Sequence, residues 1–267
     1  MAGFVHCVDF RYPSDFIATG AGAADSVFPH SFASDITHPN RPWKSAANAV
    51  PTVTYYAVDF GTAVALDGVG VDNINGSSFA LQAASTDDYA TNLITADYVV
   101  SQNKVDGRYK CFADLDGTVF DGHARRYWRI LCGLGTPVDG GSAPMQIGSV
   151  AWCKTLVRWA SGTSSYEELP LEATRVNDDY AGGGAEPVIL GHRYGAITLA
   201  GSPADREAMR TNLLALLRQG LGRPFLFYKN DGDTSDFLIA HRAGDVALKQ
   251  TAPLLMEFDN FIMRGVV

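Results

Sequence analysis

The sequence combines an ordinary globular composition with an acidic balance. It has 267 residues, of which 46% are hydrophobic and 19% are charged, and its formal net charge is −8. The length favours two domains, and the 11% aromatic residues and 27 glycines favour many strands joined by tight turns. No cluster of Lys and Arg offsets the negative charge, so the sequence predicts neither a nucleic-acid partner nor an anionic membrane partner, because both need concentrated positive charge. No stretch approaches the ~18 apolar residues of a membrane span and the N-terminus lacks the pattern of a secretory signal, so no membrane insertion is expected.

The first half of the chain has the pattern of an antiparallel β protein. In residues 52–60, Tyr56, Val58 and Phe60 fall on one face of a strand, because side chains alternate along an extended chain. Further strands are expected at residues 4–10, 64–71, 79–84, 108–113, 127–132 and 145–152. Turn dipeptides such as Asp67-Gly68 separate these runs, and no helical periodicity interrupts them. We therefore predict a mainly β fold that begins with an antiparallel jelly-roll sandwich.

After about residue 155 the pattern changes to a mixture of strands and one helix. Ser202 is a good N-cap, Pro203 suits the first helical position and Gly220 suits the end, so a helix is expected over residues 203–219. Strands are expected at residues 186–200, 224–229, 237–241 and 254–263. We therefore predict two domains, a β-sandwich at residues 1–155 and an α+β domain at residues 156–267, in which one long helix packs on an antiparallel sheet.

Three segments of the first half occur in a diagnostic order. Arg41-Pro42-Trp43-Lys44-Ser45 is followed by a strand that ends in Asp59-Phe60-Gly61, and later by Arg125-Arg-Tyr-Trp-Arg-Ile130. This order resembles that of discoidin-like (galactose-binding-like) jelly rolls, especially those of tail proteins of long-tailed bacteriophages. In the second half, a long strand, one helix, Arg223-Pro-Phe-Leu-Phe227 and a closing strand resemble the fold of phage tail tubes and distal tail proteins.

The resemblance implies a structural role rather than turnover of a substrate. It implies a component of a phage tail tip or baseplate, located in the virion and assembled in the bacterial host cytoplasm. The implied partners are other tail or baseplate proteins, further copies of the chain in a homo-oligomeric ring, and a glycan of the host surface. Under this hypothesis the protein is not an enzyme. The alternatives are a stand-alone carbohydrate-binding module and an enzyme, either a depolymerase or a phosphatase.

One end of the predicted sandwich carries side chains suited to a neutral sugar. Trp43 could stack on a sugar ring, with planar hydrogen-bonding groups supplied by Asn40, Arg41, Asn73 and Asn75. A second interpretation, favoured by the large area that an indole buries, makes Trp43 a packing anchor for its loop. The predicted ligand-binding residues are therefore Trp43, Arg41, Asn40, Asn73 and Asn75.

One motif suggests phosphoryl chemistry. Asp114-Leu-Asp-Gly-Thr118 matches the first motif of haloacid-dehalogenase-like phosphatases, in which the first aspartate is the nucleophile, the second is a general acid/base and both help to hold Mg²⁺. That chemistry needs a parallel βα framework, whereas this motif follows strand-rich sequence and is followed within ten residues by another strand. Asn177-Asp178-Asp179 is the candidate for the second acidic pair, without a βαβ framework to carry it. We interpret the motif as a polar turn and predict no catalytic residues.

No cofactor or metal is predicted. The four cysteines (Cys7, Cys111, Cys132 and Cys153) form no Cys-x-x-Cys pair, and Cys132 and Cys153 are expected to be small buried side chains. Asp35 alone is too little to predict Ca²⁺.

The basic strand at residues 125–130 has a different explanation from nucleic-acid binding. Tyr127 and Arg129 share one face of this strand, and Trp128 and Ile130 share the other. This alternation is typical of a strand with one buried and one solvated face.

Overall fold

The structure is a computed structural model of the chain, and it divides into two compact units. The sandwich unit comprises Ala2–Arg158 and Leu226–Phe237, and the C-terminal unit comprises Met1, Trp159–Phe225 and Leu238–Val267. The structure describes residues 3–10, 15–21, 29–36, 41–45, 55–104, 107–131, 146–158, 165–176, 188–201, 211, 224–230, 234–242, 247–252 and 255–265.

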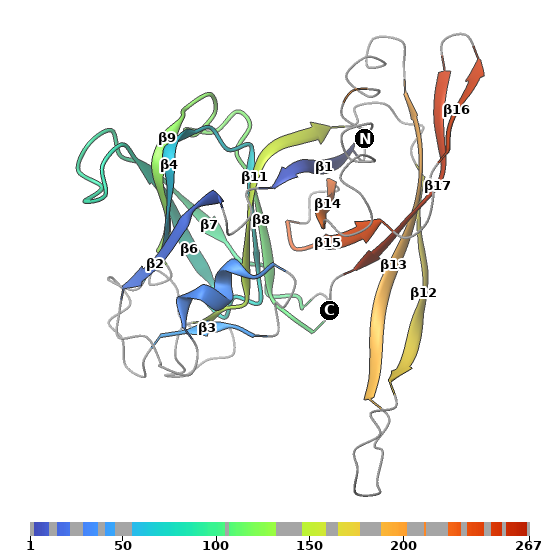
Figure 1. Cartoon of the computed structure of the whole chain (residues 1–267), viewed down its shortest axis with the longest axis horizontal. Helices are drawn as coiled ribbons and strands as arrows, with labels where there is room; N and C mark the ends of the chain where they lie inside the picture. The colour runs from blue at the N-terminus through green and yellow to red at the C-terminus, as the bar shows by residue number, and fades with distance from the viewer. Residues whose placement is uncertain are drawn as a thin grey trace, which may run out of the picture. The chain divides into compact units, whose positions relative to one another are not determined.

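One sheet of the sandwich unit has five antiparallel strands in the order β2-β4-β9-β6-β7 (Figure 1). Their bounds are β2 Ile17–Ala21, β4 Tyr55–Val64, β6 Ser78–Ala84, β7 Ile94–Val99 and β9 Arg125–Leu131. Tyr56 and Val58 on β4 and Trp128 and Ile130 on β9 point inward and are buried, which confirms the alternation predicted for both strands.

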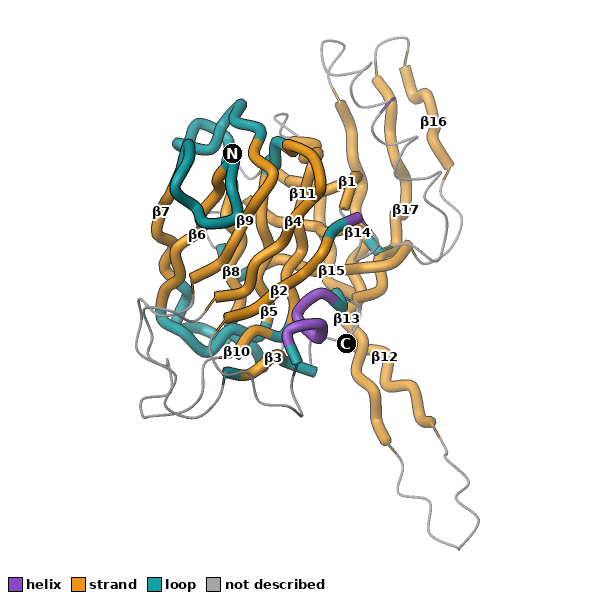
Figure 2. Tube along the Cα trace, turned by 60° about the vertical axis from the view of Figure 1, so that its left-hand side comes forward, coloured by secondary structure: helices purple, strands orange, loops and turns teal. Residues whose placement is uncertain are grey.

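The second sheet of this unit faces the first across the core, in the strand order β14-β1-β11-β5-β8 (Figure 2). Its strands are β1 Gly3–Phe10, β5 Gly68–Asp72, β8 Lys110–Asp114, β11 Ser149–Arg158 and β14 Phe225–Asn230. A short ribbon of β3 (Trp43–Lys44) and β10 (Gln146–Ile147) and the 3-10 helix η2 (His30–Ser34) complete the described part of the unit. The prediction of a mainly β, antiparallel sandwich is confirmed for this unit.

The core between the two sheets is aromatic. Trp152 of β11 stacks on Tyr56 with ring centroids 6.4 Å apart and meets the edge of Phe60 at 6.0 Å. Phe120, from the connection between β8 and β9, lies 5.5 Å from Trp128. Burying side chains of this size supplies the largest share of the stabilising free energy of such a sandwich.

A segment from far along the sequence belongs to the sandwich unit. This segment, Leu226–Phe237, is called the strap below. Its β14 residues pair with β1, for example Leu226 with Cys7, and the carbonyl of Thr234 accepts a hydrogen bond of 2.7 Å from Phe112 N–H on β8. The strap therefore bonds to the sheet β1-β11-β5-β8 at both of its edge strands.

The strap packs on the outer side of this sheet at Gly70, where the absence of a side chain leaves space for it. A Cβ built on Gly70 would lie 2.7 Å from Cδ1 of Leu226 and 3.5 Å from Cε2 of Phe237. Leu226 and Phe237 are buried, and the Phe237 ring lies 6.3 Å from that of Phe112. Glycine is the residue that allows a second chain segment to approach a strand this closely.

The C-terminal unit is also antiparallel in its described part. Its strands pair in the order β12-β13-β17-β15, with β16 also on β17. Their bounds are β12 Ser165–Val176, β13 Val188–Gly201, β15 Phe237–Arg242, β16 Ala247–Ala252 and β17 Leu255–Gly265. The strands predicted at residues 186–200, 237–241 and 254–263 are confirmed.

The helix predicted over residues 203–219 lies outside the described residues, apart from Thr211. No helix in the described part of the chain is long and apolar enough to span a membrane. The first long segment of the sandwich unit ends at Arg158, three residues beyond the predicted boundary. The strap also belongs to the sandwich unit. The predicted domains, 1–155 and 156–267, stay a prediction about independent folding.

Candidate functional site

Four of the five predicted ligand-binding residues lie on or next to neighbouring elements at one end of the sandwich, called the loop end below. The loop end consists of β3, the connection from β5 to β6 (residues 73–77) and β10. Trp43 lies on β3, with Arg41 just before it, and Asn73 and Asn75 lie in the β5–β6 connection. Asn40 lies outside the described residues.

Gln146 on β10 links the two halves of the loop end. Its backbone N–H donates to Oδ1 of Asn75 at 2.8 Å, and its side-chain Nε2 donates to Oδ1 of Asn73 at 3.3 Å. Gln146 is also the partner of Lys44 in the β3–β10 ribbon. The network holds Asn73 in the left-handed region at a φ of 55°, a conformation that asparagine tolerates better than most residues.

The sequence suggested two roles for Trp43, sugar stacking and packing, and the burial of its side chain supports the packing role. Its side chain is 0% exposed, it belongs to the core cluster, and its β10 partner Ile147 is buried as well. An indole without an exposed face cannot stack on a sugar ring in this structure. Trp43 instead fixes β3, while the neighbouring Arg41 is exposed.

Buried charges lie directly behind the loop end. Asp72, the last residue of β5, is paired with Arg108 (Nε to Oδ1, 3.1 Å) and lies 3.8 Å from Nζ of Lys110 on β8. Lys110 is buried and also donates to the carbonyl of Phe237 at 3.5 Å. Breaking such a buried pair by removing one partner is costly because the other charge stays desolvated.

The phosphatase-like motif forms the connection between β8 and β9. Oδ1 of Asp114 accepts a hydrogen bond from Asp116 N–H at 3.1 Å, and Thr118 Oγ1 donates to the Leu115 carbonyl at 2.6 Å. Gly117 has a φ of 66°, and the described chain continues into the antiparallel strand β9 rather than a helix. The Asp114 carboxylate therefore stabilises a turn, the local structure that the sequence predicted.

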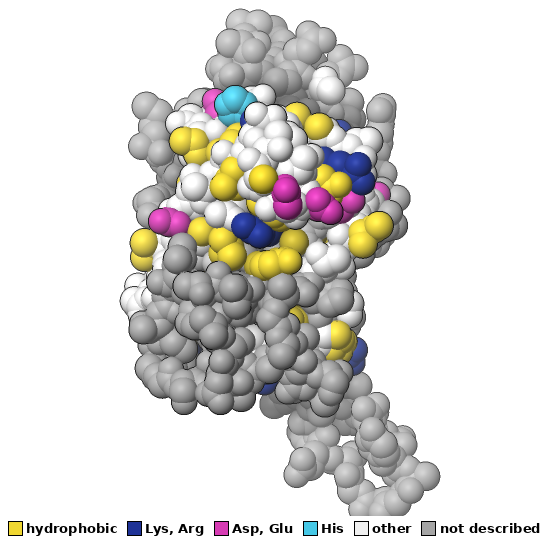
Figure 3. Space-filling model, turned by 90° about the vertical axis from the view of Figure 1, so that its left-hand side faces the viewer, with side chains coloured by type: hydrophobic (Ala, Val, Ile, Leu, Met, Phe, Trp, Pro, Cys, Tyr) yellow, Lys and Arg dark blue, Asp and Glu magenta, His cyan; other side chains and the backbone are white. Residues whose placement is uncertain are grey.

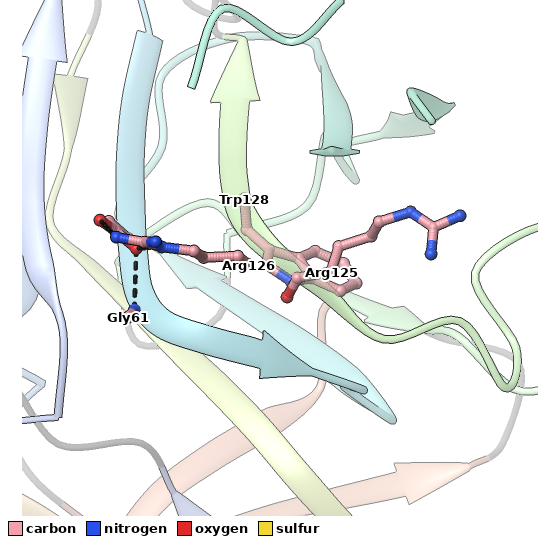
Figure 4. A network of polar contacts seen from close by, with 5 residues as sticks. Gly61, Arg125, Arg126 and Trp128 are labelled. Carbon is pink, nitrogen blue, oxygen red and sulfur yellow. Dashed lines mark hydrogen bonds and ion pairs between the residues drawn. The ribbon is translucent and has the colours of Figure 1, made fainter. Parts of the chain in front are cut away.

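The basic strand β9 forms an ion pair with the neighbouring strand β4 in the five-stranded sheet. Arg126 forms a two-pronged pair with Asp59 of β4, through Nε to Oδ1 at 2.7 Å and Nη2 to Oδ2 at 2.9 Å. Figure 4 shows Arg126 and Arg125 extending in opposite directions from β9. The hydrogen bond from Arg126 holds the pKa of Asp59 below its usual value, and the Gly61 N–H at 2.8 Å adds to this effect.

The described residues contain buried thiols but no cluster of metal ligands. Within them, no group of three or more His, Cys, Asp or Glu side chains is placed to hold a metal ion. Cys111 and Cys153 are buried, as expected for Cys153, whereas Cys132 lies outside the described part. Burial raises the pKa of the Cys111 thiol to about 12, so this thiol is unreactive at neutral pH.

Solved structures similar to this chain include carbohydrate-binding modules. The family 32 module of NanJ from C. perfringens, in complex with galactose, has a TM-score of 0.41 and 12% identity over 55% of this chain and 98% of that module. Chitosan-binding module 1 of a chitosanase/glucanase from Paenibacillus has a TM-score of 0.38 and 19% identity over 51% and 93%. The lectin domain of lectinolysin, complexed with Lewis b antigen, has a TM-score of 0.38 and 11% identity over 52% of this chain and 92% of that domain.

At such identities and TM-scores these similarities carry no functional argument by themselves. No family model and no curated protein matches the sequence.

Proposed function

We propose that the chain is a non-catalytic carbohydrate-binding protein that contacts a glycan with the loop end of its sandwich unit. The observation that carries this proposal is the network around Gln146, which joins Asn73 and Asn75 to the β3–β10 ribbon, and Arg41 lies two residues before Trp43 of that ribbon. The network thereby links β10 to the connection between β5 and β6 and to β3, which are distant in the sequence. Such convergence of polar side chains is what a small-molecule site requires.

The chemistry of the loop end suits a polyhydroxylated ligand. The guanidinium of Arg41 is exposed, and amide groups both donate and accept hydrogen bonds, which matches the dual character of sugar hydroxyls. In this proposal Trp43 supports the site from below through its burial in the core. Removing Trp43 would therefore affect binding through folding rather than through a lost contact.

The proposal is tested by titrating the full chain with glycans. A glycan array would first identify a ligand, and calorimetry would then give its Kd for the wild type and for Arg41→Ala. Because Arg41 is exposed, the variant should unfold at the wild-type urea concentration and bind about tenfold or more weakly. Lys154→Ala, which removes an exposed cation from β11, is the matched control and should bind as the wild type does. Unchanged affinity in Arg41→Ala would reject the loop end as the site.

A structural role in a phage tail tip or baseplate is the second candidate. The observation that favours it is the length of the paired strands in the C-terminal unit, where β12 and β13 have 12 and 14 residues. In the described sheet β12 pairs only with β13, and an edge of this length can accept a strand from another subunit. Electron microscopy and sedimentation of the full chain distinguish the candidates, since a tail component forms rings and a binding module stays monomeric.

A further inference from the structure

The outer face of the five-stranded sheet carries a cluster of aromatic and hydrogen-bonding side chains. The cluster, called the tyrosine face below, consists of Tyr55, Gln82, Tyr89, Tyr127 and Arg129. Four of its members project from three adjacent strands: Tyr55 from β4, Tyr127 and Arg129 from β9, and Gln82 from β6. In this sheet Arg129 is directly opposite Gln82, and β4 pairs with the other side of β9. Figure 3 looks onto this side of the molecule and shows hydrophobic side chains mixed with charged ones.

Arg129 lies at the centre of the tyrosine face. Its guanidinium carbon is 3.8 Å from the ring centroid of Tyr89 and 5.3 Å from that of Tyr55, and its Nε donates to Gln82 Oε1 at 2.7 Å. The described residues supply no carboxylate partner for Arg129, in contrast to the Asp59 that pairs with Arg126. The two terminal nitrogens of Arg129 have no hydrogen-bond partner among these residues either. A partly buried guanidinium in this state attracts an anion, and its planar fork fits a carboxylate.

Tyr89 is held against Arg129 at a cost in backbone strain. It has a φ of 57°, in the left-handed region that residues other than Gly, Asn and Asp seldom adopt. Hydrogen bonds stabilise the connection from β6 to β7 on both sides of Tyr89, because Asp88 Oδ1 accepts one from Thr86 Oγ1 at 2.6 Å and one from Ala90 N–H at 2.9 Å. Arg125 Nε also donates to the Asn92 carbonyl at 3.0 Å. Strain that the surroundings enforce in this way is a common sign of a pre-organised site.

The phenol of Tyr89 is a protonated hydrogen-bond donor at neutral pH. Burial raises the pKa of Tyr89 well above its usual value, although the nearby Arg129 guanidinium opposes this effect. Tyr55 and Tyr127 are only partly buried, so their side chains are accessible from solvent. Ala57 and Ala84 on the same face are buried.

We propose that the tyrosine face is a second binding site, which takes a carboxylate-bearing saccharide. The Arg129 fork binds the carboxylate, and the hydroxyls of Tyr55 and Tyr127 exchange hydrogen bonds with the sugar hydroxyls. This site is separate from the loop end and does not depend on the function proposed there. An acidic peptide also carries carboxylates, but it lacks the hydroxyls that the phenols around Arg129 would recognise.

The test compares an acidic saccharide with its uncharged ester. The full chain is titrated calorimetrically with trigalacturonate, with its fully methyl-esterified form and with triglutamate. Trigalacturonate should bind at least about tenfold more tightly than the other two, because the ester lacks the charge and the peptide lacks the hydroxyls. Arg129→Gln should remove this preference, whereas Lys154→Gln, which removes a cation elsewhere on the unit, should retain it.

A second variant keeps the test decisive if Arg129→Gln does not fold. Tyr127→Phe removes one hydroxyl from a partly buried ring and should weaken binding of trigalacturonate several-fold without changing the circular dichroism spectrum. Equal affinity for the acid and the ester, tighter binding of triglutamate, or no binding of trigalacturonate at millimolar concentration would each overturn the proposal. Wild-type affinity in folded Arg129→Gln would overturn it as well.

Discussion

The contact between Gly70 and the strap makes a quantitative prediction. In Gly70→Ala, the new Cβ would lie 2.7 Å from Leu226 Cδ1, so the two groups must separate by 0.7 Å to reach the 3.4 Å of an ordinary contact. Leu226 is 0% exposed and cannot turn toward solvent. Overpacking of this kind costs about 1–3 kcal/mol, and the lower entropy of the unfolded alanine chain offsets about 0.4–1 kcal/mol of it. The two ranges together allow a net loss of about 0–2.6 kcal/mol. Because the buried Leu226 cannot move away, we expect Gly70→Ala to lower the free energy of unfolding by about 1–2 kcal/mol in urea titrations of the full chain.

A double-mutant cycle isolates this contact. Leu226→Ala alone should cost about 2–5 kcal/mol, because it leaves a cavity under the strap. In the double variant the methyl group introduced at position 70 no longer meets a leucine side chain, so the two costs should fall short of additivity by about 1 kcal/mol. Leu81→Ala, in the core between the sheets, is the control partner and should add to Gly70→Ala within about 0.5 kcal/mol. A neutral Gly70→Ala, or full additivity with Leu226→Ala, would refute the packing of the strap on β5.

Three further predictions concern single side chains. Trp43→Ala should lower the free energy of unfolding by about 3–5 kcal/mol, because the indole is completely buried, and a cost below about 1 kcal/mol would contradict the anchoring role. The pKa of Asp59 is lowered in the folded state, so the stability from its pair with Arg126 is present above the unfolded pKa of about 4 and is lost as pH falls further. Urea titrations of Asp59→Asn should therefore depend less on pH below about pH 4 than those of the wild type, and identical profiles would argue against the pair. Wild type and Asp114→Asn should both lack Mg²⁺-dependent hydrolysis of p-nitrophenyl phosphate, and activity that only the wild type possesses would restore the phosphatase hypothesis.

Local patterns in the sequence were sufficient to predict strands that have one buried face. The alternation of Tyr56, Val58 and Phe60 predicted which side of β4 enters the core, and Trp128 and Ile130 did the same for β9. Other strands lack such a pattern. β12 contains three glutamates and a proline, and its extended conformation follows from pairing with β13. Pairing between distant segments can impose a strand on residues whose own preference for it is weak.

The candidate site was also predicted only in part, because some of its residues carry a local signal in the sequence and others do not. Asn73 and Asn75 stood out because asparagine near glycine is typical of turns, and Arg41 and Trp43 belonged to a recognisable loop. Gln146 carries no comparable signal, because it follows a run rich in Gly and Pro and begins a two-residue strand. Its role depends on tertiary proximity to residues about 70 positions earlier. The burial of Trp43 likewise depends on packing that a single sequence does not encode locally.

The strap covers the apolar outer side of one sheet of the sandwich unit and pairs with its edge strand β1. Its residues lie more than 200 positions after β1 in the sequence, yet they bond to β1 and to β8 and bury Leu226 and Phe237 on the outer side of β5. A sandwich that ended at residue 158 would lose the strap and leave Gly70, Ala151 and Phe112 uncovered beside a free edge of β1. Exposed apolar sheet surface next to an unpaired edge promotes association. The carbohydrate binding proposed for this unit is therefore best examined in the full chain, because in the described structure residues 226–237 cover the sheet formed by residues of the first half.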